Sequence, residues 1–426
     1  MKASEVFAAA VLLYVSTAVA DVQVNTYIPG DQSFPRVATR GDQGFAITWA
    51  SGWQDGSYDG VYARLYDASG TARTGEFQVN VETYRSQRAA DVGMDAEGRL
   101  TVVWQSLDAD SEGIWGRRYG ADGTPLGGEF QINTYQTSRQ LAPKLGVTDT
   151  GAFMVAWESN RLFPPQDHTA EWMISARAYD ASGLPGGAET VVNLLAQGEK
   201  PTPMPQPDGS WRVGYRRYGD IYHLPLTSTA QIQSLSASGD PLGDPVDLLT
   251  TGGAVYAADG AGNILLLFDQ DNNGTDSYDV YAQWYDPAFQ PKGPAYRVNT
   301  FSAGSQFISA AAVNRQGQSL LAWRSQHEGQ GWDAYAQAYD VDGTPLGGEF
   351  RLNEWMAGDQ MLTDLALNDD GRFGAVWFAS DGDGYGVFAR FGQIPEPSTA
   401  ALLALSGLRL FRWRRRDARR DGGVLR

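Results

Sequence analysis

The sequence predicts an all-β protein, a seven-bladed β-propeller of four-stranded antiparallel blades that is closed by the N-terminal strand pairing with the last blade. The first observation is a segment, DGTPLGGEFQIN at 122–133, that returns almost unchanged as DGTPLGGEFRLN at 342–353. The two copies lie four periods of about 55 residues apart, which is typical of stacked supersecondary units. The second observation is an aromatic residue that recurs with this period. The third is that residues 21–393 begin with the last strand of a repeat and end with a repeat that lacks its last strand.

The recurring aromatic closes an apolar run in every repeat. These landmark aromatics are Trp49, Trp104, Trp157, Tyr215, Phe268, Trp323 and Trp377. Propeller blades pack face to face and need large flat side chains between them. We therefore expect the landmark aromatics in the core and not at a ligand site.

The strand-like runs of the first repeat lie at 35–39, 44–49, 61–66 and 76–80. They alternate apolar and polar side chains, turn residues separate them, and none shows the period of a long helix. The third repeat carries an insertion at 160–170. The fourth repeat is degenerate, and its prolines predict an irregular segment at 201–207.

The ends of the repeat region complement each other. The seventh repeat stops after its third strand, whereas 22–26 reads as a fourth strand without the first three. We expect 22–26 to pair beside 386–391 and close the ring, because open terminal blades would expose both sheet faces. The alternative is a linear array of small β-domains, but about 55 residues make a poor independent core.

Composition excludes several classes of function. The chain of 426 residues contains no cysteine, which removes disulfides, thiolate metal sites and a cysteine nucleophile. Its formal net charge is −17, so we expect no nucleic-acid partner and repulsion from anionic lipid.

The first 20 residues have the layout of a secretory signal peptide. Lys2 precedes an apolar run at 7–15, and Ala18 and Ala20 form an Ala-x-Ala cleavage motif directly before Asp21. The alternative is a buried first strand or helix. Export is the stronger expectation, because the cleavage site directly precedes the first repeat landmark.

Residues 394–426 form a second predicted targeting signal. Pro395, Glu396 and Pro397 precede an apolar run at 400–408 and a cluster of arginines. This tail resembles the PEP-CTERM sorting signal of exported proteins of Gram-negative bacteria. The resemblance implies exosortase as a processing partner, delivery to the cell surface or extracellular matrix, and an association with exopolysaccharide. The apolar run is short for a bilayer of about 30 Å, which favours a transient membrane contact over a permanent transmembrane helix.

One acidic loop matches the start of a calcium-binding loop. Asp269, Asp271 and Asn273 place oxygen ligands at alternate positions and Gly274 supplies a tight turn, as in calcium loops that this stretch resembles in other propellers. Asp276 is the candidate closing ligand. The alternative is a solvated Asp/Asn/Gly turn, which is common.

Two tryptophans in the loops that follow the landmark strands, Trp53 and Trp332, are candidate ligand contacts, because an exposed Trp can stack on a sugar or anchor a partner.

Two functional hypotheses remain. The first is a non-enzymatic binding or structural propeller that contacts extracellular polysaccharide or another surface protein. The second is a glycan-active enzyme, a glycoside hydrolase or lyase, on the same scaffold. No catalytic residue is marked by a motif, since His is scarce, no G-x-S-x-G elbow occurs and no particular pair of carboxylates stands out. We therefore expect the non-enzymatic function.

Overall fold

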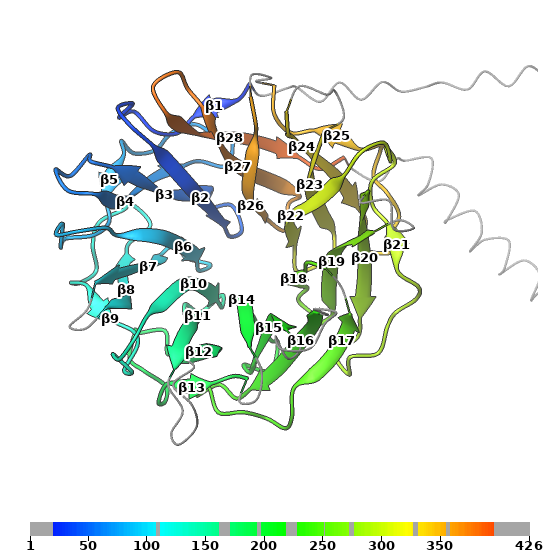
Figure 1. Ribbon diagram of the computed structural model, residues 1–426, viewed down its shortest axis with the longest axis horizontal. Coiled ribbons are helices and arrows are strands. Elements are labelled where there is room, and N and C mark those ends of the chain that lie inside the picture. The colour runs from blue at the N-terminus through cyan, green and yellow to red at the C-terminus, as the bar shows by residue number, and fades with distance from the viewer. Residues whose placement is uncertain are drawn as a thin grey trace, which may run out of the picture.

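The computed structural model is a ring of seven four-stranded antiparallel sheets arranged around a central channel (Figure 1). The structure describes residues 20–107, 111–161, 171–193, 197–218, 228–250, 252–271, 277–326, 331–354 and 358–395. Each inner strand contacts the inner strands of the two neighbouring blades, including that of blade seven with that of blade one. The predicted seven-bladed propeller is therefore confirmed.

The strands follow in chain order within each blade, from the channel outward. Blade one has β2 (Gln32–Thr39), β3 (Phe45–Gly52), β4 (Asp59–Tyr66) and β5 (Phe77–Gln78), and blade two has β6 (Arg88–Met94), β7 (Leu100–Leu107), β8 (Glu112–Tyr119) and β9 (Phe130–Gln131). Blade three has β10 (Gln140–Val147), β11 (Phe153–Arg161), β12 (Glu171–Tyr179) and β13 (Thr190–Val191), and blade four has β14 (Gly198–Pro205), β15 (Trp211–Tyr218), β16 (Ser228–Leu235) and β17 (Val246–Thr250). Blade five has β18 (Val255–Ala258), β19 (Ile264–Asp271), β20 (Tyr278–Tyr285) and β21 (Tyr296–Arg297), and blade six has β22 (Gln306–Val313), β23 (Ser319–Ser325), β24 (Asp333–Tyr339) and β25 (Phe350–Arg351). Blade seven has β26 (Met361–Leu367), β27 (Arg372–Ser380), β28 (Tyr385–Gln393) and, from the other end of the chain, β1 (Val22–Gln23).

The two ends of the repeat region meet in blade seven, as predicted. Strand β1 pairs antiparallel with β28, with Val22 opposite Ala389. The Val24 amide continues the ladder to the Val387 carbonyl at 2.8 Å, and the Asn25 side-chain oxygen accepts a hydrogen bond from the Val387 amide at 2.8 Å. The Val24 side chain is completely buried. The first and last segments thus share one blade, and their pairing closes the ring.

The landmark aromatics lie in the core, as expected. Six of the seven, all but Phe268, have less than 2% of their surface exposed, and Phe268 has 3%. They lie on the second strand of each blade, where both faces of the sheet are covered by neighbouring blades.

Blade four corrects one expectation. The proline-rich stretch is not irregular, because β14 (Gly198–Pro205) forms a full inner strand against β15. An inner strand has a partner on one side only, so Pro is tolerated where its missing N–H would point into the channel. Pro201 lies within a register shift between Glu199 and Thr202, which is a second place where a sheet accepts Pro.

The two predicted targeting signals, at the N-terminus and the C-terminus, lie mainly outside the described residues. Of the sorting motif, Pro395 is described, whereas Glu396 and Pro397 belong to the stretch 396–426 that is not, as does the signal segment 1–19. Within the described part of the chain, no helix has the length and hydropathy needed to span a bilayer. Both targeting signals stay predictions.

Candidate functional site

The central channel has two chemically different ends. All inner strands run in the same direction, so they begin together at one end and finish together at the other. We call the end where they begin the upper mouth and the end where they finish the lower mouth. The second strand of each blade returns to the upper mouth, so the loops predicted to carry ligands lie there.

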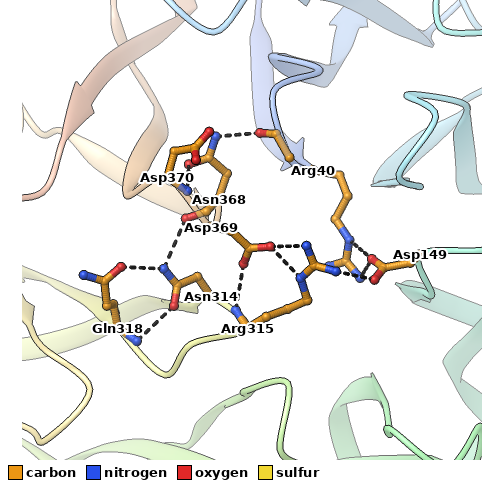
Figure 2. A network of polar contacts seen from close by, with 9 residues as sticks. Arg40, Asp149, Asn314, Arg315, Gln318, Asn368, Asp369 and Asp370 are labelled. Carbon is orange, nitrogen blue, oxygen red and sulfur yellow. Dashed lines mark hydrogen bonds and ion pairs between the residues drawn. The ribbon is translucent and has the colours of Figure 1, made fainter.

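The lower mouth is crossed by a network of charged side chains (Figure 2). Arg315, after β22, contacts Asp149 of blade three at 2.5 Å and Asp369 of blade seven through its Nε at 2.5 Å. Arg40 of blade one also donates to Asp149, at 2.5 Å from Nε to Oδ1. Because blades three and six lie on opposite sides of the ring, this network spans the channel. A ligand is therefore more readily placed at the upper mouth.

The channel wall between the mouths is lined by paired charges. Asp91 accepts a hydrogen bond from the Leu145 amide at 2.9 Å and lies 4.0 Å from both Arg36 and Lys144. Asp364 accepts from the Val37 amide at 3.0 Å. Burial raises the pKa of Asp364, and burial together with nearby Arg36 lowers the pKa of Lys144. Both groups are thus shifted toward their neutral forms.

The upper mouth is built from one repeated position, the residue directly after each landmark aromatic. We call these the mouth positions: Ala50, Gln105, Glu158, Arg216, Asp269, Arg324 and Phe378. In six blades this residue pairs with the residue near the start of the inner strand, as in Leu141 with Glu158, Glu199 with Arg216 and Phe307 with Arg324. Paired residues of antiparallel strands share one face, so each blade presents two side chains there.

Two carboxylates of the upper mouth, Glu158 and Glu199, lie close enough where blade three faces blade four for the charge of one to act on the other. Glu158 accepts a hydrogen bond from the Lys200 amide at 2.9 Å. Glu199, on the inner strand of blade four, lies 3.3 Å from Arg216 and accepts a hydrogen bond from the hydroxyl of Tyr218. Both carboxylates are half-buried. One carboxylate is thus held by a backbone amide and the other by a cation and a phenol.

The environments of these groups differ in a way that matters for acid–base chemistry. Burial, and then the nearby charge of Glu199, raise the pKa of Glu158, although the Lys200 amide opposes the shift. Burial and the hydrogen bond to Glu199 raise the pKa of Tyr218 to about 12, so this phenol is neutral at ordinary pH. A carboxyl with a raised pKa beside an arginine-paired carboxylate is the usual arrangement of an acid and its partner.

A backbone feature directs the Lys200 amide toward Glu158. Lys200 has φ of 53° and lies in the register shift of β14. Ala142 has φ of 48° at the equivalent place in β10, and its amide donates to Gln105 of the preceding blade at 3.1 Å. Left-handed residues in such bulges are strained, and they re-aim groups near functional sites. Here the bulge ties an inner strand to the mouth position of its neighbour.

Aromatic side chains gather on the other side of the upper mouth. Phe34 of blade one lies 5.5 Å from Phe378 of blade seven, and Phe378 lies 5.4 Å from Tyr385, measured between ring centroids. Phe34 is 54% exposed although it is apolar. Exposed rings of this kind can stack on sugars.

Both predicted ligand-contact tryptophans lie in this upper region. Trp53 is 61% exposed and its ring lies 5.1 Å from that of Tyr58, so they form a pair beyond the end of β3. Trp332 is half-buried and contacts Phe307, with ring centroids 5.5 Å apart. Whether either contacts a ligand stays a prediction.

The predicted calcium loop is described only in part. Asp269 and Asp271 lie at the end of β19, and Asp269 accepts a hydrogen bond from the Gly253 amide at 2.7 Å. Asn273 and Asp276 lie outside the described residues. Over the described ranges, no three acidic or His side chains gather closely enough to hold a metal ion. Calcium at this loop stays a prediction.

The sequence had not singled out the residues of the carboxylate site. Glu158 follows the landmark Trp157 at a position whose residue type changes from repeat to repeat, and only Asp269 in blade five also supplies a carboxylate there. A position that varies among repeats with a constant aromatic neighbour was therefore a usable signal. Glu199 lies just before the proline-rich segment 201–207, whose expected irregularity hides the inner strand that carries Glu199.

Comparison with known proteins supports the fold. No family model and no curated protein matches the chain. Among solved structures, the polysaccharide lyase Uly1 is 11% identical with a TM-score of 0.52, covering 86% of this chain and 90% of its own. A protein of unknown function from Dyadobacter fermentans is 10% identical with a TM-score of 0.51, covering 88% and 98%. The α-L-arabinanase of Penicillium chrysogenum is 14% identical with a TM-score of 0.47, covering 88% and 98%.

The likeness to the polysaccharide lyase Uly1 contradicts the expectation of a non-enzymatic binding or structural module. A solved structure that shares this propeller is a polysaccharide lyase, which favours the second hypothesis, a glycan-active enzyme. At 11% identity the likeness shows the fold alone. The reaction must therefore be argued from the mouth residues of this chain.

Proposed function

We propose that the protein is an enzyme that cleaves glycosidic bonds of a polysaccharide at the upper mouth of its channel. The observation that carries the proposal is the meeting of Glu158 and Glu199 between blades three and four, with a raised pKa on Glu158 and Arg216 beside Glu199. Glycoside hydrolysis uses two carboxyl groups in unlike environments, one protonated and one ionised.

In hydrolysis, Glu158 is the general acid. Its proton passes to the glycosidic oxygen as the bond to the anomeric carbon breaks, and the leaving sugar departs as an alcohol. Glu199 is the second carboxylate. It either takes a proton from the attacking water or bonds to the anomeric carbon before water releases the sugar, and the two routes give opposite anomers. Arg216 and Tyr218 hold Glu199 in position.

A lyase reaction is the second candidate, and Tyr218 is the observation that favours it. Elimination removes the proton beside the carboxylate of a uronic acid and protonates the leaving oxygen. Tyr218 already donates a hydrogen bond to Glu199, so Glu199 can receive the sugar proton directly or through the phenol. Glu158 would again protonate the leaving oxygen. The same residues thus support either reaction, and the product distinguishes them.

The test is a screen of the purified protein against neutral and acidic polysaccharides. Hydrolysis produces new reducing ends without a new double bond, and elimination produces new reducing ends together with ultraviolet absorbance from an unsaturated uronide. We expect one of these signals on at least one substrate. Absence of both across the panel, from protein shown to be folded, would overturn the proposal.

We also propose that the enzyme acts outside the cell and that its tail is processed by an exosortase. The support is sequence alone, namely the signal-like segment 1–20 and the motif of Pro395, Glu396 and Pro397. Replacing the motif by three alanines should leave the protein unprocessed in a host that carries the protease. Unchanged processing would remove this proposal without affecting the enzymatic one.

A further inference from the structure

We infer that Arg324, framed by Trp332 and Phe307, forms a subsite for an anionic substituent of the glycan, so that the substrate is an acidic polysaccharide. The inference rests on the proposed function, because it assigns the substrate class of the same upper mouth. The group recognised is a carboxylate or a sulfate ester on a sugar whose ring lies against the aromatic side chains.

Arg324 differs from the other arginines of the upper mouth. Arg216 lies 3.3 Å from Glu199, and Arg88 and Arg139 share Glu112 at 3.5 and 2.6 Å. Within the described ranges Arg324 makes no ion pair. Its Nη1 lies 3.3 Å from the sulfur of Met361, which is a weak acceptor.

The surroundings of Arg324 disfavour an unpaired charge. The side chain is half-buried, and burial lowers the pKa of its guanidinium, while the charge of Asp359 opposes the shift. An arginine remains protonated despite such a shift. A desolvated cation without a carboxylate partner is costly, and an incoming anion offsets that cost.

The aromatic frame adds a surface for the sugar itself. Phe307 is the cross-strand partner of Arg324, and the Arg324 guanidinium carbon lies 5.7 Å from the centre of the Trp332 ring. Tyr278 extends the row, with its ring 5.3 Å from Phe307. The Trp332 amide donates to Asp359 at 3.0 Å, which holds the backbone of Trp332 in place. A planar cation beside aromatic faces suits an acidic sugar, because the Arg324 guanidinium can bind the anionic group while the aromatic rings pack on the pyranose.

The position of the subsite agrees with the catalytic assignment. Blade six, with β22 and β23, lies across the channel from β11, which carries Glu158 (Figure 1). A glycan bound at the upper mouth can therefore contact Arg324 with one sugar and the carboxylates with another. The formal charge of −17 gives the protein no general attraction for a polyanion, so retention of an acidic glycan needs a specific cation.

The test measures binding rather than turnover. Titration calorimetry would use three probes, an oligogalacturonate for the carboxylate, a sulfated oligosaccharide and a neutral gluco-oligosaccharide. We expect Arg324→Gln to weaken binding of one acidic probe by roughly tenfold or more, as for a lost charge-assisted hydrogen bond. Arg324→Lys should recover part of the loss, since it restores charge without the planar fork. The acidic probe affected identifies the anion.

The matched control is Arg85→Gln, which removes an exposed guanidinium between β5 and β6 whose side chain stacks on Tyr84, while the backbone amide of Arg85 keeps its hydrogen bond to Ser57. It should bind like the wild type, and all variants should unfold at similar temperatures. Equal affinity of Arg324→Gln and wild type for both acidic probes, or no binding of either by the wild type, would overturn the subsite. Arg324-dependent binding without cleavage would instead overturn the proposed enzymatic function.

Discussion

Glu158 combines a backbone contact that is found at another mouth position with a carboxyl group that can take part in acid–base chemistry. Its neighbour Trp157 is fully buried, yet Glu158 itself reaches the channel and accepts a hydrogen bond from the bulged Lys200 amide of the next blade. The equivalent Gln105 makes the same kind of contact with Ala142. The scaffold contact is thus shared between blades two and three, and the carboxyl group of Glu158 is what distinguishes blade three from blade two.

The pKa of Glu158 should depend on Glu199. Because the charge of Glu199 contributes to the upward shift after burial, Glu199→Gln should lower the Glu158 pKa without returning it fully to the ordinary value. A general acid works in its protonated form, so the wild-type shift extends activity to higher pH. Carbon-13 NMR titration of the side-chain carboxyls, assigned with Glu158→Gln, measures this directly. An unchanged or higher pKa of Glu158 in Glu199→Gln would show that the charge of Glu199 does not act on Glu158.

At the scale of elements, the inner strands combine two tasks. Their first residues build the upper mouth, and the turns that follow them carry the network of Arg40, Asp149, Arg315 and Asp369 at the lower mouth. The register shifts near the start of six inner strands aim backbone groups without breaking the sheet. Blade four performs the first task despite its prolines, through Glu199 and the Lys200 amide.

Loss of the lower network should have a small, salt-sensitive effect on stability. Asp149→Asn weakens the contacts with Arg40 and Arg315, whose side chains remain partly exposed, so we expect a loss of about 1 kcal/mol or less. Screening should reduce the difference in high salt. Urea unfolding in low and high salt measures both effects. Glu97→Gln, which removes a contact within blade two only, is the control and should cost less.

The strands could be read from sequence, whereas the site could not. Alternation and the landmark aromatics such as Trp49 sufficed for the sheets, because they depend on local pattern and period. Glu158 and Glu199 come from different blades, and their meeting depends on a bulge at Lys200 that no local rule predicts. Trp53 and Trp332 were predictable as loop aromatics. That Arg324 makes no ion pair within the described ranges could be seen only in the assembled ring.

At the scale of the whole molecule, closure by β1 determines whether the mouth keeps its shape. The pairing of Val22 with Ala389 holds the segment that leads into blade one within blade seven, and Arg36 of blade one donates a hydrogen bond to the Thr363 carbonyl of blade seven at 2.7 Å. The aromatic group of Phe34, Phe378 and Tyr385 spans the same junction. Opening the ring would therefore disturb the mouth as well as the core.

Asn25→Ala tests closure against a chemically identical control. Asn25 accepts a hydrogen bond from Val387 across the closing pair, and Asn80 accepts one from Val61 within blade one, both at 2.8 Å. Each substitution should cost about 1–3 kcal/mol, because it leaves a buried amide unsatisfied. Only Asn25→Ala should accelerate hydrogen exchange in β28. Equal protection of β28 in both variants would show that another contact holds the ring closed.

Turnover by the wild type, Glu158→Gln and Glu199→Gln on one polysaccharide tests the central claim most directly. Each substitution is nearly isosteric and removes a proton donor or a carboxylate, so we predict a fall in kcat of at least about 100-fold with unchanged unfolding temperature. Full activity in either variant would contradict the assignment of the reaction to the junction of blades three and four.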